Sequence, residues 1–418
     1  MKVFYITNAL THYYNMVLSK LNNEKDIDLI VIVPRDVSSH VGEGVYQTKK
    51  NISFPYHELE EYQLFGAITG FRALGRLLLR EKPDVVIVGP SYLLPFILNV
   101  HIAWIMKAIR CKLILQSIPF RLPTYEEARN TSYKETELIQ SLPIWLSLML
   151  RKSGMEKILR WSFLRVVKHA YCRVDAHLIY VKEGYEIYGS YGVDVEKIFI
   201  SYNSPDTDVL LDLRNSLVTQ ESILPNCDHR LIHVGRLVEW KRVDLLIRAL
   251  KRVKETFRDA ELVVVGFGPQ EKELKDLCDR LHLSESVRFV GGIYEPRLLG
   301  KYLLASSVYV LAGMGGLSIS DAMCFGLPVI CSVCDGTEKV LVRDGVNGKI
   351  FREGDEDDLV EKIEYLLGDP QMRADMGRKS LEIIRNEVNI HTVIQGFRDA
   401  LEYVTGKGKR QPVSKRPG

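Results

Sequence analysis

The chain has 418 residues, of which 46% are hydrophobic and 26% are charged, and its formal net charge is +3. This length predicts two domains, this composition excludes a largely disordered chain, and so small a charge gives no sign of a nucleic-acid-binding protein. Seven cysteines at irregular spacing do not predict a disulfide framework, and the first residues enter a strand-like segment rather than a signal peptide. We therefore expect a cytoplasmic protein.

Short apolar, β-branched segments recur along the chain with helix-compatible stretches between them. The first half contains KVFYIT, DLIVIV, DVVIVG, KLILQS, HLIYV and KIFIS, and the second half contains LIHVG, ELVVVG, VRFVG, VYVLA and PVICS. Because these segments are apolar throughout rather than alternating, they predict parallel strands covered by helices on both faces. The expected fold class is α/β, with two doubly wound parallel-sheet domains.

Residues 91–109, SYLLPFILNVHIAWIMKAI, are long enough and apolar enough to be compared with a membrane span. Pro95, Asn99, His101 and Lys107 interrupt the segment, and a polar or ionisable group is costly in hydrocarbon. We expect a buried core helix here.

A later segment, KILRWSFLRVVKHA, has a basic side. Helical spacing places Lys157, Trp161, Arg165 and Lys168 opposite an apolar stripe. A basic face with a tryptophan suits the surface of an anionic membrane, and an ordinary solvated helix face explains it equally well. The basic residues near the C-terminus favour peripheral attachment to the inner face of a membrane.

The domain boundary is expected where a strand ends in Asn, Ser, Pro and Asp, which gives an N-terminal domain over residues 1–205 and a C-terminal domain over residues 206–390. Residues 391–406 are expected to form a helix that crosses back to the N-terminal domain, and residues 407–418 a basic disordered tail. Asp206 and Asp208 resemble a metal-binding acid pair, but no other ligand cluster accompanies them, so turn-forming acids are favoured. Cys331 and Cys334 have the spacing of a redox or zinc pair, and a single pair is more often coincidental.

Glycines follow the strands of the second half, at Gly235, Gly266, Gly291 and Gly313. Ligands bind at the carboxyl ends of strands in open parallel sheets, and glycine lets the backbone approach a ligand closely. Arg236 and Lys241 follow the first of these glycines and offer two cations to a diphosphate, although a solvated basic pair is the alternative.

Five segments of the second half resemble successive motifs of glycosyltransferase family 4: HVGRLVEWKRVDLLIRAL, VVVGFGPQEKELK, VRFVGGI, GGLSISDAMCFGLPVICS and DGTEKVLVRDGVNGKIF. The resemblance implies the GT-B fold, with two facing Rossmann-like domains. It also implies retaining transfer of a sugar from a nucleotide-diphosphate donor, with no metal and no other cofactor.

The resemblance also assigns residues. It implies that Arg236 and Lys241 are the catalytic groups holding the donor diphosphate. The amides of Gly316 and Leu317, with Gly315 in the same turn, face the phosphates, and Asp321 binds the ribose. Gly235, Gly266, Gly291, Ile293 and Gly313 complete the donor-binding positions.

This sequence departs from the family pattern at three places. Gly313 replaces the first of two acids, which normally helps to hold the donor sugar. Gln116 and Ser117 stand where the N-terminal domain usually offers a histidine. The first strand is followed by TNALTHYY, without the frequent glycine-rich loop. His12 in that loop and Arg121 are candidates for contact with the acceptor. An ordinary surface or turn histidine is an equally good interpretation of His12.

The expected function is a retaining, metal-independent glycosyltransferase acting on a glycan or lipid-linked acceptor in the synthesis of a surface polysaccharide. The alternative is a non-catalytic protein of the same fold that binds nucleotide sugar without turnover. An oxidoreductase is disfavoured because no Gly-x-Gly-x-x-Gly follows the first strand.

Overall fold

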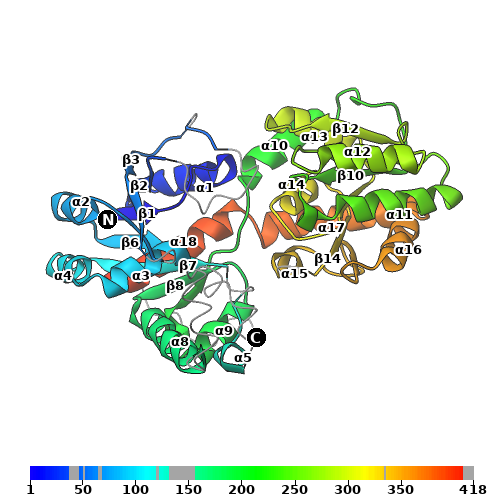
Figure 1. Ribbon diagram of the computed structural model, residues 1–418. Helices are drawn as coiled ribbons and strands as arrows, with labels where there is room; N and C mark the ends of the chain where they lie inside the picture. Colours follow the sequence, from blue (N-terminus) through cyan, green and yellow to red (C-terminus); the bar gives the residue numbers. More distant parts are fainter. Residues whose placement is uncertain are drawn as a thin grey trace. The chain divides into compact units, whose positions relative to one another are not determined.

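The structure, a computed structural model, describes residues 1–36, 47–49, 52–64, 68–118, 122–130, 156–333 and 336–407. The chain divides into two compact units. Unit 1 comprises Met1–Tyr202 and the segment that begins at Val393, and unit 2 comprises Asn203–Thr392. Each unit has a parallel sheet with helices on its faces (Figure 1), so the predicted α/β class with two parallel-sheet domains is confirmed.

The sheet of unit 1 has the strand order β3-β2-β1-β6-β7-β8-β9, and all of these neighbours are parallel. Its strands are β1 (Lys2–Ile6), β2 (Asp28–Pro34), β3 (Tyr56–Leu59), β6 (Val85–Val88), β7 (Lys112–Ser117), β8 (Ala176–Ile179) and β9 (Ile198–Ile200). A separate antiparallel pair consists of β4 (Glu61–Leu64) and β5 (Ile68–Phe71). The central strands are buried on both faces, which is why they read as continuous apolar segments.

Helices cover both faces of this sheet. They are α1 (His12–Asn22), α2 (Leu74–Glu81), α3 (Pro90–Leu98), α4 (Val100–Ala108), α5 (Tyr125–Asn130), α8 (Glu156–Arg173) and α9 (Glu183–Ser190), with a 3-10 turn at Val195–Lys197. The apolar sides of α2, α3, α4, α8 and α9 form one buried core with strand residues such as Phe4 and Val86, and α1 buries Val17, Leu18 and Leu21 outside this cluster.

The predicted single core helix over residues 91–109 is wrong in one respect, because the structure has two helices there. α3 and α4 meet at an angle of 84°. The break lies at Asn99, whose side chain accepts hydrogen bonds from the amides of His101 and Ile102 and so starts α4. Among the residues that the structure describes, no single helix has the length and apolarity of a bilayer span, and only this bent pair meets that test, as two helices taken together.

The sheet of unit 2 has the strand order β12-β11-β10-β13-β14-β15, again parallel throughout. The strands are β10 (Arg230–Val234), β11 (Glu261–Val265), β12 (Val287–Gly291), β13 (Val308–Leu311), β14 (Val329–Ser332) and β15 (Gly348–Phe351). The helices are α10 (Thr207–Leu217), α11 (Val243–Thr256), α12 (Glu271–Arg280), α13 (Pro296–Leu304), α14 (Ser318–Cys324), α15 (Thr337–Leu341), α16 (Glu356–Leu367) and α17 (Pro370–Asn386), with a 3-10 helix η4 (Glu239–Lys241) before α11.

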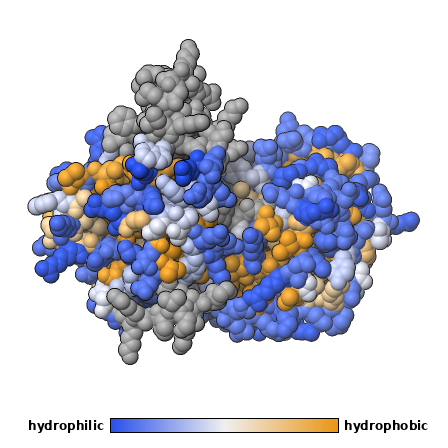
Figure 2. Space-filling view, turned by 90° about the horizontal axis from the view of Figure 1, so that it is seen from below, coloured by the Kyte–Doolittle hydropathy of each residue, from blue (hydrophilic) through white to orange (hydrophobic). Residues whose placement is uncertain are grey.

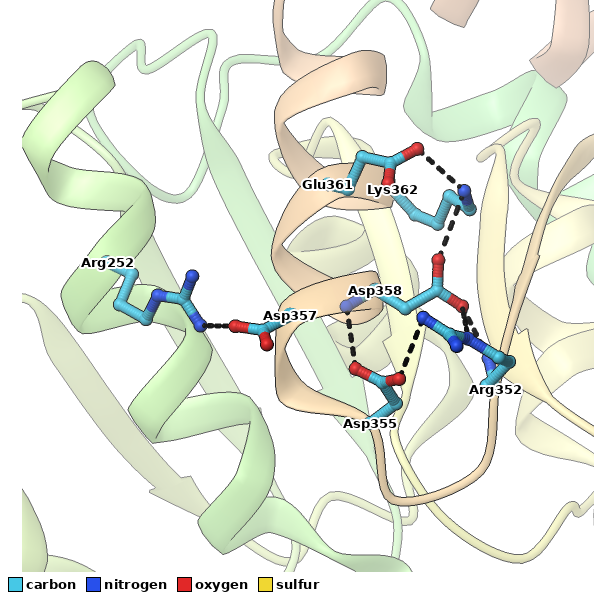
Figure 3. Close-up of polar contacts among 7 residues, drawn as sticks. All are labelled: Arg252, Arg352, Asp355, Asp357, Asp358, Glu361 and Lys362. Atoms are coloured by element: carbon cyan, nitrogen blue, oxygen red, sulfur yellow. Dashed lines mark hydrogen bonds and ion pairs between the residues drawn. The ribbon is translucent and has the colours of Figure 1, made fainter.

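The start of α16 is fixed by a network of carboxylates and cations (Figure 3). Asp355 caps the helix by accepting from the amide of Asp358 at 3.0 Å, and the carboxylate of Asp358 accepts from the amide of Arg352 at 2.7 Å. Arg252 on α11 pairs with Asp357, which ties the two helices together. Most of these groups are exposed, so each ion pair contributes at most about 1 kcal/mol, and we read the network as structural.

The last helix, α18 (Ile390–Thr405), contains the point at which the chain passes from unit 2 to unit 1. Within unit 1, Arg398 donates to the carboxylates of Glu24 and Asp26 at 2.6 and 3.0 Å. Gly396 lies so close to β9 that an added Cβ would be 2.3 Å from the carbonyl oxygen of Ile200. The basic tail that the sequence analysis singled out lies, from residue 408 onward, outside the described residues.

Candidate active site

In unit 2 the order of the strands reverses between β10 and β13, which are neighbours in the sheet although β11 and β12 come between them in the chain. In open parallel sheets, ligands bind outside the carboxyl ends of the strands at such a reversal. The loops after β10 and β13 carry Arg236, Lys241 and the glycines of residues 313–316. The topology therefore brings together, at one sheet edge, the residues that the sequence assigned to the diphosphate.

The loops after β10 and β11 run against each other, backbone to backbone. The amide of Gly235 donates to the carbonyl of Val265 at 2.9 Å. A Cβ on Gly266, which has φ = +153°, would lie 1.8 Å from the carbonyl oxygen of Gly235. Gly266 is therefore required by the packing of these two loops, and its contact with a donor stays a prediction.

The loop after β13 turns tightly and packs against η4. The amide of Met314 donates to the carbonyl of Trp240 at 2.8 Å. A Cβ on Gly313 would lie 2.2 Å from that same oxygen and 2.9 Å from Cα of Lys241. No side chain fits at this position without moving η4, which gives a physical reason why the acid of the family pattern is replaced by glycine here.

Lys241 lies under the glycine turn. Its Nζ donates to the carbonyls of Met314 and Gly315 at 2.9 and 2.8 Å, and the residue is 8% exposed. A Cβ on Gly316 would be 3.2 Å from this ammonium group. The lysine thus holds the turn in shape and places a full positive charge beside its backbone amides.

Arg236 supplies the second cation. Its guanidinium lies 5.5 Å from the centre of the Trp240 ring, and the residue is half-buried. A guanidinium over an aromatic face is held by a cation–π contact while its edge still offers donors in a fork that matches phosphate oxygens.

His233 lies beneath the same loops on β10 and is fully buried. Its Nδ1 is 3.2 Å from the carbonyl oxygen of Val310, which can only accept, so this nitrogen carries the proton. Burial and the nearby Lys241 ammonium lower the pKa of His233 to about 4. The ring is therefore neutral at pH 7, and it adds no third cation to the site.

Asp321 lies one turn into α14, and the residue is half-buried. Desolvation raises the pKa of its carboxyl group to about 7. Nearby, the hydroxyl of Tyr309 donates to Ser318 at 2.7 Å. A partly exposed carboxyl group at this place can accept hydrogen bonds from a polar ligand such as the diol of a ribose.

This raised pKa makes stability depend on pH. Between the unfolded value of 3.8 and about 7 the folded protein holds a proton on Asp321 that the unfolded chain has lost, so stability falls as pH rises through this range. The free energy of unfolding of wild type relative to Asp321→Asn is expected to fall by about 2 kcal/mol between pH 5 and pH 8. Urea denaturation across this range measures it, with the exposed Asp276→Asn as the matched control. Parallel pH profiles for wild type and Asp321→Asn would show that the carboxyl group is not desolvated.

The remaining donor positions lie after β12. Gly291 has φ = +75° and accepts the amide of Gly266 at 2.8 Å through its carbonyl, and Ile293 is half-buried two residues on. The structure therefore places Gly235, Gly266, Gly291 and Gly313 on adjacent strand ends of one sheet. The donor assignments of Gly315, Gly316 and Leu317 also remain predictions, supported by their position above Lys241.

In unit 1 the carboxyl end of β7 carries an uncharged hydroxyl cluster. Oε1 of Gln116 accepts from the Tyr5 hydroxyl at 2.6 Å, and its Nε2 donates to the hydroxyls of Tyr14 and Tyr180 at 2.6 and 3.2 Å. Burial raises the pKa of all three tyrosines well above the usual value, so the cluster is neutral. His12 begins α1 and stacks edge-on against Tyr13, with ring centres 5.5 Å apart. Arg121 lies outside the described residues.

Sequence reasoning missed three residues of unit 2. From the sequence, His233 was only part of a strand and Trp240 only part of a loop. In the structure His233 lies near the Lys241 ammonium, and the Trp240 ring lies against the Arg236 guanidinium. Glu338 is fully buried at the start of α15 and accepts from the amide of Gly336 at 3.0 Å. The sequence feature that could have indicated Glu338 is an acid inside the segment DGTEKVL, which follows a predicted strand.

The other candidate sites in the sequence are structural in the described residues. Asp206 caps α10 by accepting from the amide of Val209, and Asp208 pairs with His391 at 2.9 Å. The described ranges hold no group of three or more potential metal ligands. Cys331 is buried in β14, and Cys334 lies outside the described residues.

The basic face of α8 is only partly free to bind another molecule, because two of its cations already contact aromatic rings. The Arg165 guanidinium lies 3.4 Å from the centre of the Trp161 ring, and the Lys168 ammonium lies 4.9 Å from that of Tyr125. The side chain of Lys157 lies outside the described residues.

Known proteins resemble this chain in both sequence and fold. Residues 219–382 match the family model of glycosyl transferases group 1. An uncharacterized glycosyltransferase of Haemophilus influenzae is 26% identical over 192 residues, which cover 45% of this chain and 53% of the relative. The D-inositol 3-phosphate glycosyltransferase of Kribbella flavida is 28% identical over 240 residues, 53% of this chain and 55% of the relative. The chain thus spans about half the length of these curated relatives.

Solved structures match over nearly the whole chain. HepE from Anabaena in complex with UDP superposes with a TM-score of 0.66 at 17% identity, covering 96% of this chain and all of that one. Sucrose-phosphate synthase from Thermosynechococcus elongatus gives 0.63 at 15% identity, covering 98% of this chain. This chain has the GT-B fold, as the sequence predicted, and most of unit 2 resembles the glycosyl transferases of group 1.

Proposed function

We propose that this protein is a glycosyltransferase that takes a sugar from a nucleotide-diphosphate donor. The observation that carries the proposal is the position of Lys241, buried beneath a turn of glycines at the switch point of unit 2, with Arg236 on the same loop after β10. Burying a lysine costs free energy unless its charge is used or paired. Here two backbone carbonyls hold the Lys241 ammonium group at the turn, where its positive charge favours binding of an anion.

The proposed reaction breaks the bond between the anomeric carbon and the diphosphate oxygen, and forms a bond between that carbon and an acceptor oxygen. Negative charge grows on the leaving phosphate, which Arg236, Lys241 and the turn amides stabilise. A donor aimed at developing charge typically contributes about 3 kcal/mol, or about a hundredfold in rate. Protein cations at these positions provide charge stabilisation that does not require a metal ion.

Retention of configuration is part of the proposal. The acceptor attacks from the face that the diphosphate leaves, and the departing phosphate oxygen takes the acceptor's proton. This route needs no basic side chain in unit 1, which agrees with the neutral cluster around Gln116. The proposed acceptor is a hydroxyl of a glycan or a lipid-linked glycan.

The proposed setting is the synthesis of a surface polysaccharide, with the protein in the cytoplasm and peripherally attached to the inner face of a membrane. Trp161 and Arg165 on α8 are the described residues of the basic face that support this attachment.

The alternative, a non-catalytic protein that binds donor without turnover, is motivated by Gly313. The lost acid leaves the donor sugar with one ligand fewer, whereas the diphosphate site keeps both cations. Binding and turnover therefore have to be measured separately.

Two assays on one donor panel test the proposal. Thermal shift with uridine, guanosine and thymidine diphosphates should raise the melting temperature with at least one of them, because a ligand that binds only the folded state stabilises it. The matching nucleotide sugars should then release or transfer sugar in the presence of glycan acceptors. Stabilisation without any turnover would support the non-catalytic alternative, and no stabilisation by any diphosphate would overturn the donor site.

A further inference from the structure

The corner between α3 and α4 presents large apolar side chains to solvent. Val100 is 81% exposed, Trp104 is 64% exposed and Leu98 is 47% exposed. Val100 and Trp104 are one helical turn apart, so they lie on one outward face of α4, and Leu98 ends the preceding helix beside them. On the left of Figure 2, where unit 1 lies, orange apolar side chains reach the surface among blue polar ones.

The exposed face is held rigidly by the opposite face of the same helix. Ile102, Ile105 and Met106 are buried in the core of unit 1, and a Cβ on Gly75 of α2 would lie 3.1 Å from the side chain of Ile105. The Asn99 cap fixes the break between the helices. Val100 and Trp104 therefore cannot turn inward without unpacking α4, so their exposure is built into the fold.

The charge around this corner is positive. Residues 90–112 contain no Asp or Glu, and Lys107 and Arg110 are exposed at the end of α4. Arg76 is exposed on α2, the helix that packs against α4. The nearby acids are already engaged: Glu81 on α2 pairs with Lys2 and Arg80, and Glu61 on β4 accepts from the Tyr92 hydroxyl of α3 at 2.6 Å. A partner that covers this corner must therefore accept both apolar side chains and cations.

We propose that the α3–α4 corner, defined by Leu98, Val100, Trp104, Lys107 and Arg110, is a docking surface for an anionic lipid bilayer. Tryptophan favours the boundary between headgroups and acyl chains, short apolar side chains enter beside it, and cations meet anionic headgroups. The corner has all three, and it is more exposed than the α8 face, where Arg165 covers the Trp161 ring. This inference deepens the proposed peripheral attachment, but docking itself does not depend on sugar transfer.

Vesicle co-sedimentation of the full chain tests the docking surface. The probe is phosphatidylcholine vesicles with and without phosphatidylglycerol, at low and high salt. Wild type should bind the anionic vesicles, and binding should weaken with salt. Val100→Glu with Trp104→Glu should lower binding to both kinds of vesicle by about tenfold or more, because apolar insertion is lost. Lys107→Gln with Arg110→Gln should lower binding by about tenfold, and on the anionic vesicles only.

The matched control is Val218→Glu with Lys251→Gln, at two exposed positions of unit 2, which should bind within about twofold of wild type. Trp161→Glu with Arg165→Gln on α8 tests the other proposed contact and should lower binding less than the corner variants do. Lipids brominated in the acyl chain should quench tryptophan fluorescence of wild type, and Trp104→Phe should remove most of this quenching without relying on a charged substitution. Melting curves establish that each variant folds.

Three outcomes would overturn the proposal: wild-type binding by the corner variants, loss of binding only in the α8 variant, or a corner that changes the oligomeric state while no vesicle is bound. The last would make the corner a self-association face. Transfer to a soluble acceptor is measured in parallel. Corner variants that bind no vesicles yet transfer sugar normally would support docking, whereas absent transfer with intact vesicle binding would count against the proposed function alone.

Discussion

Replacing Lys241 by alanine is expected to lower the rate of sugar transfer by about a hundredfold or more. The ammonium group lies beneath the glycine turn and is held by the carbonyls of Met314 and Gly315. Its removal takes away both the charge that stabilises the departing diphosphate and the two hydrogen bonds that shape the turn. Arg236→Ala is expected to have an effect of the same size on turnover, because it removes the second cation that faces the departing diphosphate.

The two variants should differ in stability. Lys241→Ala leaves two carbonyls without their donor in a buried place, so it should lower the free energy of unfolding by about 1–3 kcal/mol, whereas Arg236→Ala should lower it by less than about 1 kcal/mol. Steady-state transfer rates and urea denaturation measure the two effects. Lys251→Ala, at an exposed position of α11, is the matched control. Wild-type transfer rates in both site variants would mean that the diphosphate binds elsewhere.

Restoring the acid of the family pattern, by Gly313→Glu, is expected to destroy the site rather than repair it. A Cβ at this position would lie 2.2 Å from the carbonyl oxygen of Trp240, and that atom is backbone, which cannot rotate away. The chain must then displace η4, and with it Lys241. The expected cost is about 1–3 kcal/mol of unfolding free energy, with a loss of donor binding.

Gly313→Ala separates the two parts of this effect, because it adds the Cβ without the carboxylate. If steric displacement of η4 is the cause, Gly313→Ala should lose most of the donor affinity that Gly313→Glu loses, as measured by calorimetry with nucleoside diphosphate. Gly189 on α9 is exposed, and an added Cβ there meets nothing within 4 Å, so Gly189→Ala and Gly189→Glu are the matched controls. Higher transfer activity in Gly313→Glu would contradict this explanation of the missing acid.

Much of the fold was accessible from local patterns in the sequence. Buried parallel strands such as β10, β11 and β13 read as short apolar segments because both of their faces are covered, and this pattern needs no knowledge of distant residues. The break between α3 and α4 at Asn99 was not predicted from the sequence, although Asn99 was noted as a polar residue that interrupts the apolar segment. Asn is a common helix cap, but the segment is apolar on both sides of Asn99, so its sequence pattern does not show that the chain bends by 84° there.

Part of the candidate site could likewise be predicted from the sequence, and part of it depends on contacts in the folded protein. Arg236, Lys241 and the glycines stand beside strand ends, and the resemblance to family motifs placed them on one site. The reason for Gly313 was not predictable, because it arises from contact with the backbone of η4, which lies more than 70 residues earlier in the chain. The buried state of Lys241 and the neutral His233 also depend on contacts between β10 and β13, which meet only in the folded sheet.

A crystal of the protein soaked with the nucleoside diphosphate that gives the largest thermal shift tests the central claim most directly. The diphosphate should lie over residues 313–317 of unit 2, with the Arg236 guanidinium and the Lys241 ammonium nearest to its oxygens and Asp321 toward the ribose. Density for the nucleotide in unit 1, or an empty turn beside a nucleotide bound elsewhere in unit 2, would contradict the assignment.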